Sequence, residues 1–293
     1  MAKKDINVLD LFCGCGGLSL GFEKAGYHVV LGIDVWKDAL VTYKYNHKES
    51  DTLCADLSNL TADEVEKHIG GKTIDVIIGG PPCQGFSVAG KRIVEDERNK
   101  LYKSFVRMVD HFRPRAFVME NVPNILTIGQ GVVKQSIIGD FERLGYKVEN
   151  RVLTASNYGV PQNRRRAVFV GLIDDTFDFS IPEVEHKVTC FEALCDLPES
   201  SLEDGSLYPV EATCDYQKIM RQSSNGVFNH LITDHDEKTK SIISLVPDGG
   251  NYQDLPEELQ QTRRVHIAWT RLNSKKPSIT IDTGHRHHFH YRW

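Results

Sequence analysis

The sequence lacks any apolar run long enough to cross a bilayer, although 40% of its 293 residues are hydrophobic. Its first residues, MAKKD, lead into a predicted strand, so the long apolar stretch of a secretory signal is also missing. Internal repeats and low-complexity tracts are absent as well. These absences predict an ordinary globular chain without a membrane partner, large enough for one big domain or two smaller ones.

The sequence also lacks the even cysteine count of a disulfide framework, because it contains seven cysteines. We therefore expect reduced thiols, as in an intracellular protein. Such thiols are available for chemistry wherever their surroundings favour the thiolate.

An overall excess of positive charge is missing too, and the net charge of -5 argues weakly against a nucleic-acid partner. The average hides an asymmetry. Residues 262–293 hold seven basic residues and one acidic residue, a local charge of about +6 that leaves about -11 for the rest. A basic region on an acidic body suits a polyanion held on one face, and a solvated surface segment is an equally good interpretation.

Short β-branched runs alternate with helical patterns over the first 175 residues. This alternation predicts an α/β fold with a mostly parallel, doubly wound sheet, and we expect its last two strands to form an antiparallel pair. Residue 61 or 58 is the expected cap of the third helix. We expect strands at 6–12 and 29–33, a third strand region before Asp56, and strands at 75–78, 116–119, 146–153 and 167–172, with helices at 18–25, up to 46, 61–68, 101–112 and 133–144.

The pattern changes after about residue 175, where short helical and loop signals mix with many Ser, Asp, Glu and Gly. We therefore expect a catalytic domain at 1–180 and a smaller, irregular domain at 181–293. Four histidines near the end could suggest a metal site, but no cysteine or carboxylate nearby has ligand spacing, so no metal is predicted. These histidines are His285, His287, His288 and His290.

A glycine-rich turn, from Asp10 to Gly17, lies between the first strand and the first helix. Glycines there allow a ligand to approach the backbone closely, and the helix start offers free N–H groups. Ser19 stands where a dinucleotide fingerprint has its third glycine, which disfavours NAD. Asp34 and Asp56, after the next strands, could accept hydrogen bonds from a ribose and an adenine. Together these signals favour S-adenosylmethionine, although each alone is often only a tight turn or a cap.

A single thiol, Cys83, lies in the segment GGPPCQGFS that follows the apolar run VII at 76–78. Glycines and prolines fix the backbone there and keep bulk away from the thiol, which is what a nucleophile needs. In doubly wound sheets the first and fourth strands are commonly adjacent, so the glycine turn and Cys83 should face each other.

Two further groups follow strand ends. Glu120 comes after the fifth strand and can act as an acid if its pKa is raised, although a capping or salt-bridged role is the commoner one. Arg164 and Arg166 lie on one face where the last strand begins, and arginine suits a carbonyl, carboxylate or phosphate partner. The alternative is a cluster of charges at the strand start that acts only as a gatekeeper against aggregation.

These pieces, in this order, resemble the C5-cytosine DNA methyltransferase family. The matching segments are Asp10–Gly17, Pro82-Cys83-Gln84, Glu120-Asn121-Val122 and Tyr158–Gln162 with Arg164 and Arg166, within residues 5–175. The resemblance implies a Rossmann-like methyltransferase sheet, and in the second domain target recognition of double-stranded DNA. It implies methyl transfer from S-adenosylmethionine to C5 of a flipped-out cytosine in a restriction-modification system, in the cytoplasm of a prokaryote and near its nucleoid.

The resemblance also implies residue roles. Cys83 would attack C6 of cytosine, Glu120 would protonate N3, and Arg166 with Arg164 would hold the O2 edge. Val35 stands where the family often has an aromatic that stacks on adenine, and Asp34 where it often has Glu. The implied cofactor residues are Phe12, Gly14, Gly16, Gly17, Asp34, Val35, Asp56, Leu57 and Pro82, and the implied DNA contacts are Gln84, Ser87, Lys91, Arg92, Arg98 and Arg271.

The family's last motifs, which end in a helix beside the cofactor pocket, have no match in this sequence. Three explanations remain open: a second polypeptide that supplies them, a shortened form of a longer chain, or an inactive relative. Methylation of RNA cytosine, or a non-catalytic module that binds S-adenosylmethionine or DNA, are the alternative functions.

Overall fold

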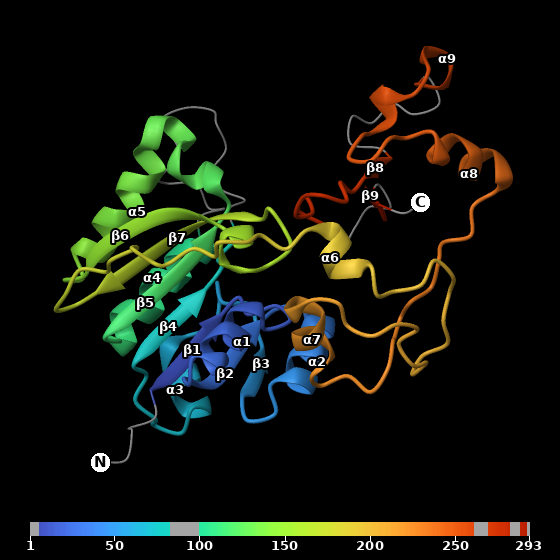
Figure 1. Ribbon diagram of the computed structural model, residues 1–293. Coiled ribbons are helices and arrows are strands. Elements are labelled where there is room, and N and C mark those ends of the chain that lie inside the picture. The colour runs from blue at the N-terminus through green and yellow to red at the C-terminus, as the bar shows by residue number, and fades with distance from the viewer. Residues whose placement is uncertain (1–5, 83–99, 261–268, 282–287, 292–293) are drawn as a thin grey trace. The chain divides into compact units, whose positions relative to one another are not determined.

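The computed structural model describes residues 6–82, 100–260, 269–281 and 288–291. The chain divides into two compact units (Figure 1). The first unit is Met1–Leu153 with Arg165–Ile181, and the second unit is Thr154–Arg164 with Pro182–Trp293. This division differs from the expected boundary at residue 180 in one segment, because Thr154–Arg164 belongs to the second unit.

The first unit is built on a seven-stranded sheet with the order β3-β2-β1-β4-β5-β7-β6. β1 pairs in parallel with β2 and β4, β3 with β2, and β5 with β4, whereas β7 runs antiparallel to β5. The predicted mostly parallel α/β sheet is thus confirmed. The strands are β1 (Asn7–Leu11), β2 (His28–Asp34), β3 (Asp51–Cys54), β4 (Val76–Gly79), β5 (Ala116–Asn121), β6 (Lys147–Thr154) and β7 (Arg165–Leu172).

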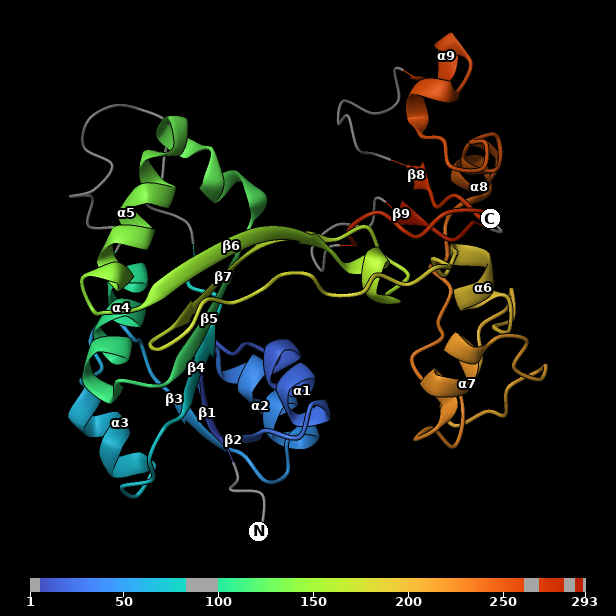
Figure 2. The same ribbon diagram turned by 60° about the vertical axis from the view of Figure 1, so that its left-hand side comes forward.

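Helices cover both faces of this sheet. Figure 2 shows α1 and α2 on one face and α3, α4 and α5 on the other, as a doubly wound fold requires. Two 3-10 turns after β5, η2 (Pro123–Leu126) and η3 (Ile128–Gly131), were not predicted. The helices are α1 (Gly17–Lys24), α2 (Lys37–Asn46), α3 (Ala62–His68), α4 (Lys100–Phe112) and α5 (Val132–Glu142).

The start of α3 shows how local sequence sets an element boundary. The Thr61 hydroxyl accepts the Glu64 N–H at 3.3 Å, and the Glu64 carboxylate accepts the Thr61 N–H at 2.8 Å. This reciprocal capping box satisfies two N–H groups that the helix itself leaves unpaired. Thr61, one of the two expected caps, is therefore the cap.

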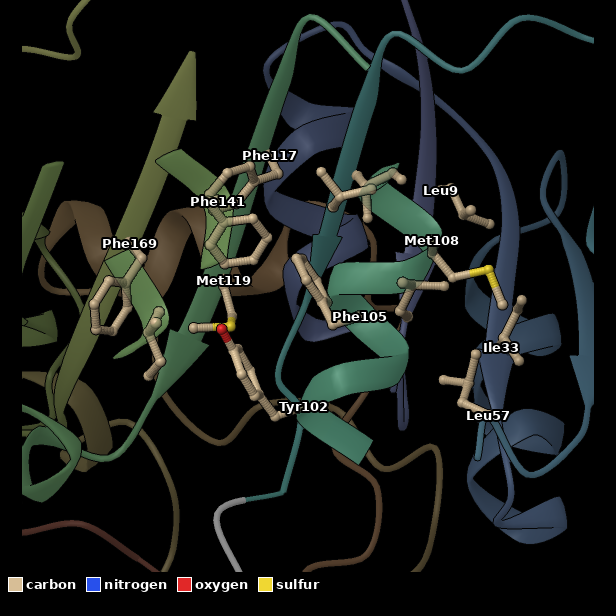
Figure 3. Packing of buried hydrophobic residues seen from close by; sticks show 14 of the residues in the cluster. Leu9, Ile33, Leu57, Tyr102, Phe105, Met108, Phe117, Met119, Phe141 and Phe169 are labelled. Atoms are coloured by element: carbon tan, nitrogen blue, oxygen red, sulfur yellow. The ribbon is translucent and has the colours of Figure 1, made fainter. Parts of the chain in front are cut away.

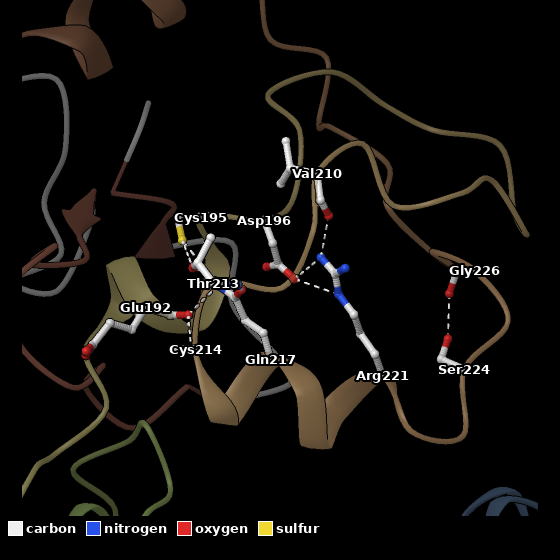
Figure 4. A network of polar contacts seen from close by, with 10 residues as sticks. All are labelled: Glu192, Cys195, Asp196, Val210, Thr213, Cys214, Gln217, Arg221, Ser224 and Gly226. Atoms are coloured by element: carbon white, nitrogen blue, oxygen red, sulfur yellow. Dashed lines mark hydrogen bonds and ion pairs between the residues drawn. The ribbon is translucent and has the colours of Figure 1, made fainter.

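The second unit is less regular and depends on polar contacts. Arg221 donates to Asp196 at 2.6 Å (Figure 4). Its guanidinium also lies over the ring of Tyr208, 3.9 Å from the centroid. The Gln217 amide donates to the Glu192 carbonyl at 2.6 Å and accepts the N–H of Thr213 at 2.7 Å. Its elements are η4 (Ala155–Tyr158), α6 (Cys190–Leu194), α7 (Asp215–Arg221), α8 (Glu237–Ser244), η5 (Tyr252–Asp254), α9 (Glu257–Gln260), β8 (Thr270–Arg271) and β9 (His288–Phe289).

Aromatic rings form the centre of the first unit's core. Phe105 of α4, Phe117 of β5 and Phe141 of α5 are fully buried (Figure 3). The rings of Phe117 and Phe141 stack with centroids 4.0 Å apart, and Phe105 meets both edge-on. Gly171 of β7, the direct partner of Phe117 on the neighbouring strand, leaves room for the Phe117 ring, because a Cβ there would lie 2.0 Å from it. No described helix has the length and apolar character needed to cross a membrane.

A methyl group at Gly171 should therefore disturb the core. We expect Gly171→Ala to lower the free energy of unfolding by about 1–3 kcal/mol, because Phe117 must leave a close-packed stack. Gly139→Ala in α5 is the matched control: its Cβ meets the nearest atom, on Arg143, at 3.7 Å, and alanine favours a helix by roughly 0.5–1 kcal/mol. Denaturant unfolding of both variants is the measurement, and an unchanged Gly171→Ala would contradict the packing described.

Candidate active site

The groups singled out from sequence in the first unit converge because the strands before them are parallel neighbours. β1 lies between β2 and β4, and β5 lies next to β4. Parallel strands end at the same edge of a sheet. The glycine turn after β1, Asp34 at the end of β2, Gly80 after β4 and Glu120 near the end of β5 therefore lie along one edge.

The glycine turn has a run of left-handed backbone. Phe12, Gly14 and Gly16 have φ of 60°, 53° and 90°. A Cβ at Gly14 or Gly17 would meet no atom within 4 Å, so this side of the turn is open. A Cβ at Gly16 would lie 2.1 Å from Nε2 of His47, a buried residue. Gly14 and Gly17 thus leave space for a ligand, whereas Gly16 makes room for His47.

Asp34 ties the glycine turn to the start of α2. Its carboxylate accepts the N–H of Gly14 at 2.8 Å through one oxygen and the N–H of Trp36 at 2.8 Å through the other. A carboxylate has about four acceptor positions, so two remain for ligand hydroxyls. The neighbouring side chains of Val35 and Trp36 are 68% and 63% exposed. An acceptor thus lies beside exposed apolar surface, an arrangement that suits a nucleoside.

Two neighbouring residues that the resemblance implies for the cofactor site, Asp56 and Leu57, differ in exposure. Asp56 accepts hydrogen bonds from Ser58 N at 2.8 Å and Asn59 Nδ2 at 3.2 Å. The bonds from Ser58 lower its pKa, so this exposed carboxyl is ionised at neutral pH. Leu57 is 2% exposed and belongs to the main core. Asp56 is therefore available to a ligand, whereas the side chain of Leu57 is committed to packing.

Asp10, one residue before the end of β1, is a buried acid that sequence reasoning did not assign. Its Oδ2 accepts the Ser19 hydroxyl at 2.6 Å, and the Ser19 oxygen lies 2.8 Å from the Tyr43 hydroxyl. Its Oδ1 is buried without a hydrogen-bond partner among the described residues. Desolvation raises the pKa of Asp10 to about 7, against the opposing effect of the Ser19 bond. The only sequence signal was an acid within the apolar run of a buried strand.

Glu120 and Arg166 form an ion pair at the end of β5. Arg166 Nε lies 2.5 Å from Glu120 Oε1, and the two side chains are 23% and 28% exposed. The other oxygen of Glu120 lies beside Gly80, where a Cβ would approach it to 3.1 Å. β7 brings Arg166 here because it runs antiparallel to β5. Arg164, the other predicted arginine, belongs to the second unit.

Asn121 holds the chain that leads to the predicted nucleophile. It is 6% exposed, and its amide donates to the Pro81 carbonyl at 2.9 Å while its side-chain oxygen accepts Val122 N–H at 2.8 Å. Pro81 is buried and Pro82 is exposed. Asn121 was quoted in the motif without a role, since a spacing does not show which backbone group an amide meets. Cys83, Gln84, Ser87, Lys91, Arg92 and Arg98 lie outside the described residues.

Arg271, the predicted DNA contact in β8, has a guanidinium group that is partly buried. Its Nε and Nη2 are buried and have no hydrogen-bond partner within the described part of the chain. Burial lowers the pKa of the guanidinium, and Asp248 opposes the shift. These two nitrogens form one edge of the guanidinium fork, which is suited to a two-oxygen acceptor.

Among the described residues, one group of three possible metal ligands occurs, made by Asp63, Glu66 and His111. All three are exposed and lie on α3 and α4, on the face opposite α1 and α2. No metal is expected from the sequence, and this exposed group does not change that expectation.

Comparisons with known proteins decide the family. The profile of C-5 cytosine-specific DNA methylases matches residues 6–290. The chain belongs to this family. It is 37% identical to the Type II methyltransferase M1.HphI of Haemophilus parahaemolyticus over 291 residues, 98% of this chain and 73% of that protein. It is 38% identical to the Type II methyltransferase M.DdeI of Desulfomicrobium norvegicum over 275 residues, 88% of this chain and 65% of that one. The resemblance drawn from sequence is confirmed.

A solved structure agrees with the fold. A protein described as a DNA modification methyltransferase encoded within a prophage (E. coli) superposes with a TM-score of 0.70 at 26% identity, over 94% of this chain and 82% of that one. The chain spans about two thirds of the length of its curated relatives, 73% of M1.HphI and 65% of M.DdeI.

The glycine turn offers a matched pair of substitutions. Gly16→Ala places a methyl group against buried His47 at a left-handed φ, and we expect a loss of about 2–4 kcal/mol in the free energy of unfolding. Gly17→Ala at the start of α1 meets no atom within 4 Å, so it should change stability by less than about 0.5 kcal/mol. Thermal and denaturant unfolding compare the two, and equal losses would rule out the packing of Gly16 on His47.

Proposed function

We propose that this chain carries the catalytic machinery of a DNA cytosine-C5 methyltransferase of the restriction-modification type. The methyl donor is S-adenosylmethionine and the acceptor is C5 of a flipped-out cytosine in double-stranded DNA. The observation that supports this most is the Glu120–Arg166 pair, which lies beside Gly80 three residues before Cys83. In this proposal an acid, a cation and a thiol act on one base.

The chemistry requires covalent help because C5 of cytosine is a poor nucleophile. The Cys83 thiolate adds to C6, which turns C5 into an enamine-like carbon that can take a methyl group. Loss of the C5 proton and expulsion of the thiolate then restore the aromatic ring. A stacked base does not expose C6, so the cytosine must leave the duplex before the thiolate attacks.

Glu120 and Arg166 have complementary tasks in this proposal. Glu120 protonates N3 as the thiolate adds, which removes the negative charge that would build up on the ring. Arg166 fixes the carboxyl group through Oε1 at 2.5 Å and supplies positive charge for the O2 edge. Asn121 positions the loop by fixing the Pro81 carbonyl, two residues before the thiol.

The open side of the glycine turn suits S-adenosylmethionine. Gly14 and Gly17 leave the backbone accessible, Asp34 keeps acceptor positions for ribose hydroxyls, and Asp56 offers an acceptor for the adenine amino group. When bound, this group supplies an activated methyl. Phe12, half-buried against the main core, would support the purine from the turn.

Charge within the second unit indicates which part meets DNA. Residues 182–260 hold sixteen acidic and five basic residues, whereas residues 262–293 hold seven basic and one acidic. Phosphates favour the basic part and are repelled by the acidic part. We therefore place DNA contact on the basic part, including Arg271, and we propose a bacterial, DNA-associated location. The trapping assay described next, run with and without candidate partner chains, also tests whether a second polypeptide completes the enzyme.

Trapping with 5-fluorocytosine tests the reaction directly. Duplex DNA containing 5-fluorocytosine in candidate sites, mixed with S-adenosylmethionine and this chain, should give a covalent adduct, because fluorine at C5 blocks the final elimination. Cys83→Ala should give none, and Glu120→Gln should slow adduct formation by roughly 10²–10⁴-fold. Denaturing electrophoresis is the measurement, with and without candidate partner chains. No adduct from the unaltered chain under any of these conditions would refute a catalytic role.

The side chains next to Asp34 test the adenine subsite. Trp36 occupies the cap position of α2 without a side-chain cap bond, and its exposed indole offers more stacking area than Val35. We expect Trp36→Ala to weaken S-adenosylhomocysteine binding about 5- to 100-fold, since base stacking is worth about 1–3 kcal/mol. Val35→Ala, the matched control, should weaken it less than about 5-fold. Calorimetry measures both, and the reverse order would assign adenine to Val35, as the family position suggests.

A further inference from the structure

Asp10 is the one fully buried acid whose carboxylate lacks a partner for one oxygen among the described residues. Its hydrogen bond from Ser19 joins the end of β1 to the first turn of α1 and so closes the glycine turn between them. Tyr43 of α2 supports Ser19 from the other side at 2.8 Å. The acid therefore belongs to the structure that shapes the proposed cofactor site.

Within the described part of the chain, no positive charge is among the groups that shift the pKa of Asp10. The hydroxyl and the backbone N–H of Ser19 and the carboxylate of Asp34 act on it, and Asp10 in turn raises the pKa of the Cys13 thiol and of the Tyr43 hydroxyl. Desolvation raises the pKa of Asp10 most, and the carboxylate of Asp34 raises it further. Buried carboxylates are normally paired with a cation or with several donors. Ser19 donates to Asp10 through its hydroxyl and its backbone N–H, but both donors are neutral, so among the described residues this carboxylate has no counter-charge.

S-adenosylmethionine carries two positive groups, a sulfonium and an ammonium. We propose that Asp10 is the electrostatic partner of this positive charge, so that binding of the methyl donor ionises Asp10 and releases its proton to solvent. This inference rests on the proposed cofactor. The competing interpretation is an acid that only closes the turn and keeps the same proton before and after binding.

The sign of the effect follows from linkage. With a pKa of about 7, Asp10 is about half protonated in the free protein at neutral pH. A cation nearby favours the ionised form, so binding should release up to about half a proton at pH 7. Affinity should accordingly fall as pH drops below 7, by at most about tenfold per pH unit.

Calorimetry in buffers of different ionisation enthalpy measures this proton release. S-adenosylmethionine titrated into the wild-type chain at pH 7 in phosphate and in Tris should give different heats, and the difference reports the number of protons. Adenosine, which lacks both positive groups, is the matched ligand control and should release none. Asp10→Asn should bind S-adenosylmethionine with less release, and subtracting its value removes any proton from the ligand's own amino group. Tyr43→Phe, which keeps the acid, should retain the release.

The outcomes separate the inference from the function beneath it. If S-adenosylmethionine does not bind, the proposed cofactor is wrong. If it binds with the same proton release in wild type and Asp10→Asn, the inference about Asp10 is wrong and the cofactor stands. If adenosine releases as many protons as S-adenosylmethionine in the wild type, the linkage belongs to the nucleoside subsite, which also overturns the inference. The comparison of S-adenosylmethionine with adenosine uses only the wild-type chain, so it does not depend on whether the variants fold.

Discussion

Parallel pairing of β1 with β2 and β4 is the constraint on which the site depends. It makes these strands end together, so that a glycine turn, an acceptor and the segment before the thiol occupy one edge. The antiparallel β7 has a different consequence. Because it runs against β5, its first residues lie beside the last residues of β5, and Arg166 meets Glu120. The antiparallel direction of β7 thus brings Arg166 to the site, whereas a parallel strand would have placed it at the opposite edge of the sheet.

Hydrogen bonds fix the segments that follow the strands. Asp34 binds the backbone of Gly14 and Trp36, Ser19 binds Asp10, and Asn121 binds the Pro81 carbonyl. The left-handed φ of Phe12 costs free energy, and these bonds, together with core packing of its ring, keep the turn in that conformation. The glycine turn, the start of α2 and the backbone at Pro81 are therefore held by the protein's own contacts and do not need a ligand to order them.

Most of the framework could be predicted from sequence, because β-branched runs and helical periodicity are local signals. Four motifs in order, at Asp10–Gly17, around Cys83, at Glu120 and before Arg166, also identified the family. Other features could not be predicted, since they arise between distant segments. The amide of Asn121 meets a carbonyl 40 residues away, Ser19 was noticed only as a missing glycine, and Leu57 packs inward where a ligand contact was expected. The assignment of Thr154–Arg164 to the second unit likewise depends on contacts, not on composition.

That assignment has a topological consequence. The chain passes between the units three times, after residues 153, 164 and 181, so the second unit is formed from two separate pieces of sequence. The pieces are joined by backbone pairing, in which Asn163 N–H donates to Ser278 O at 2.7 Å and Ser278 N–H donates to Pro161 O at 2.9 Å. Transplanting this unit into a relative therefore means moving both pieces together, and no single proteolytic cut in the chain can release it whole.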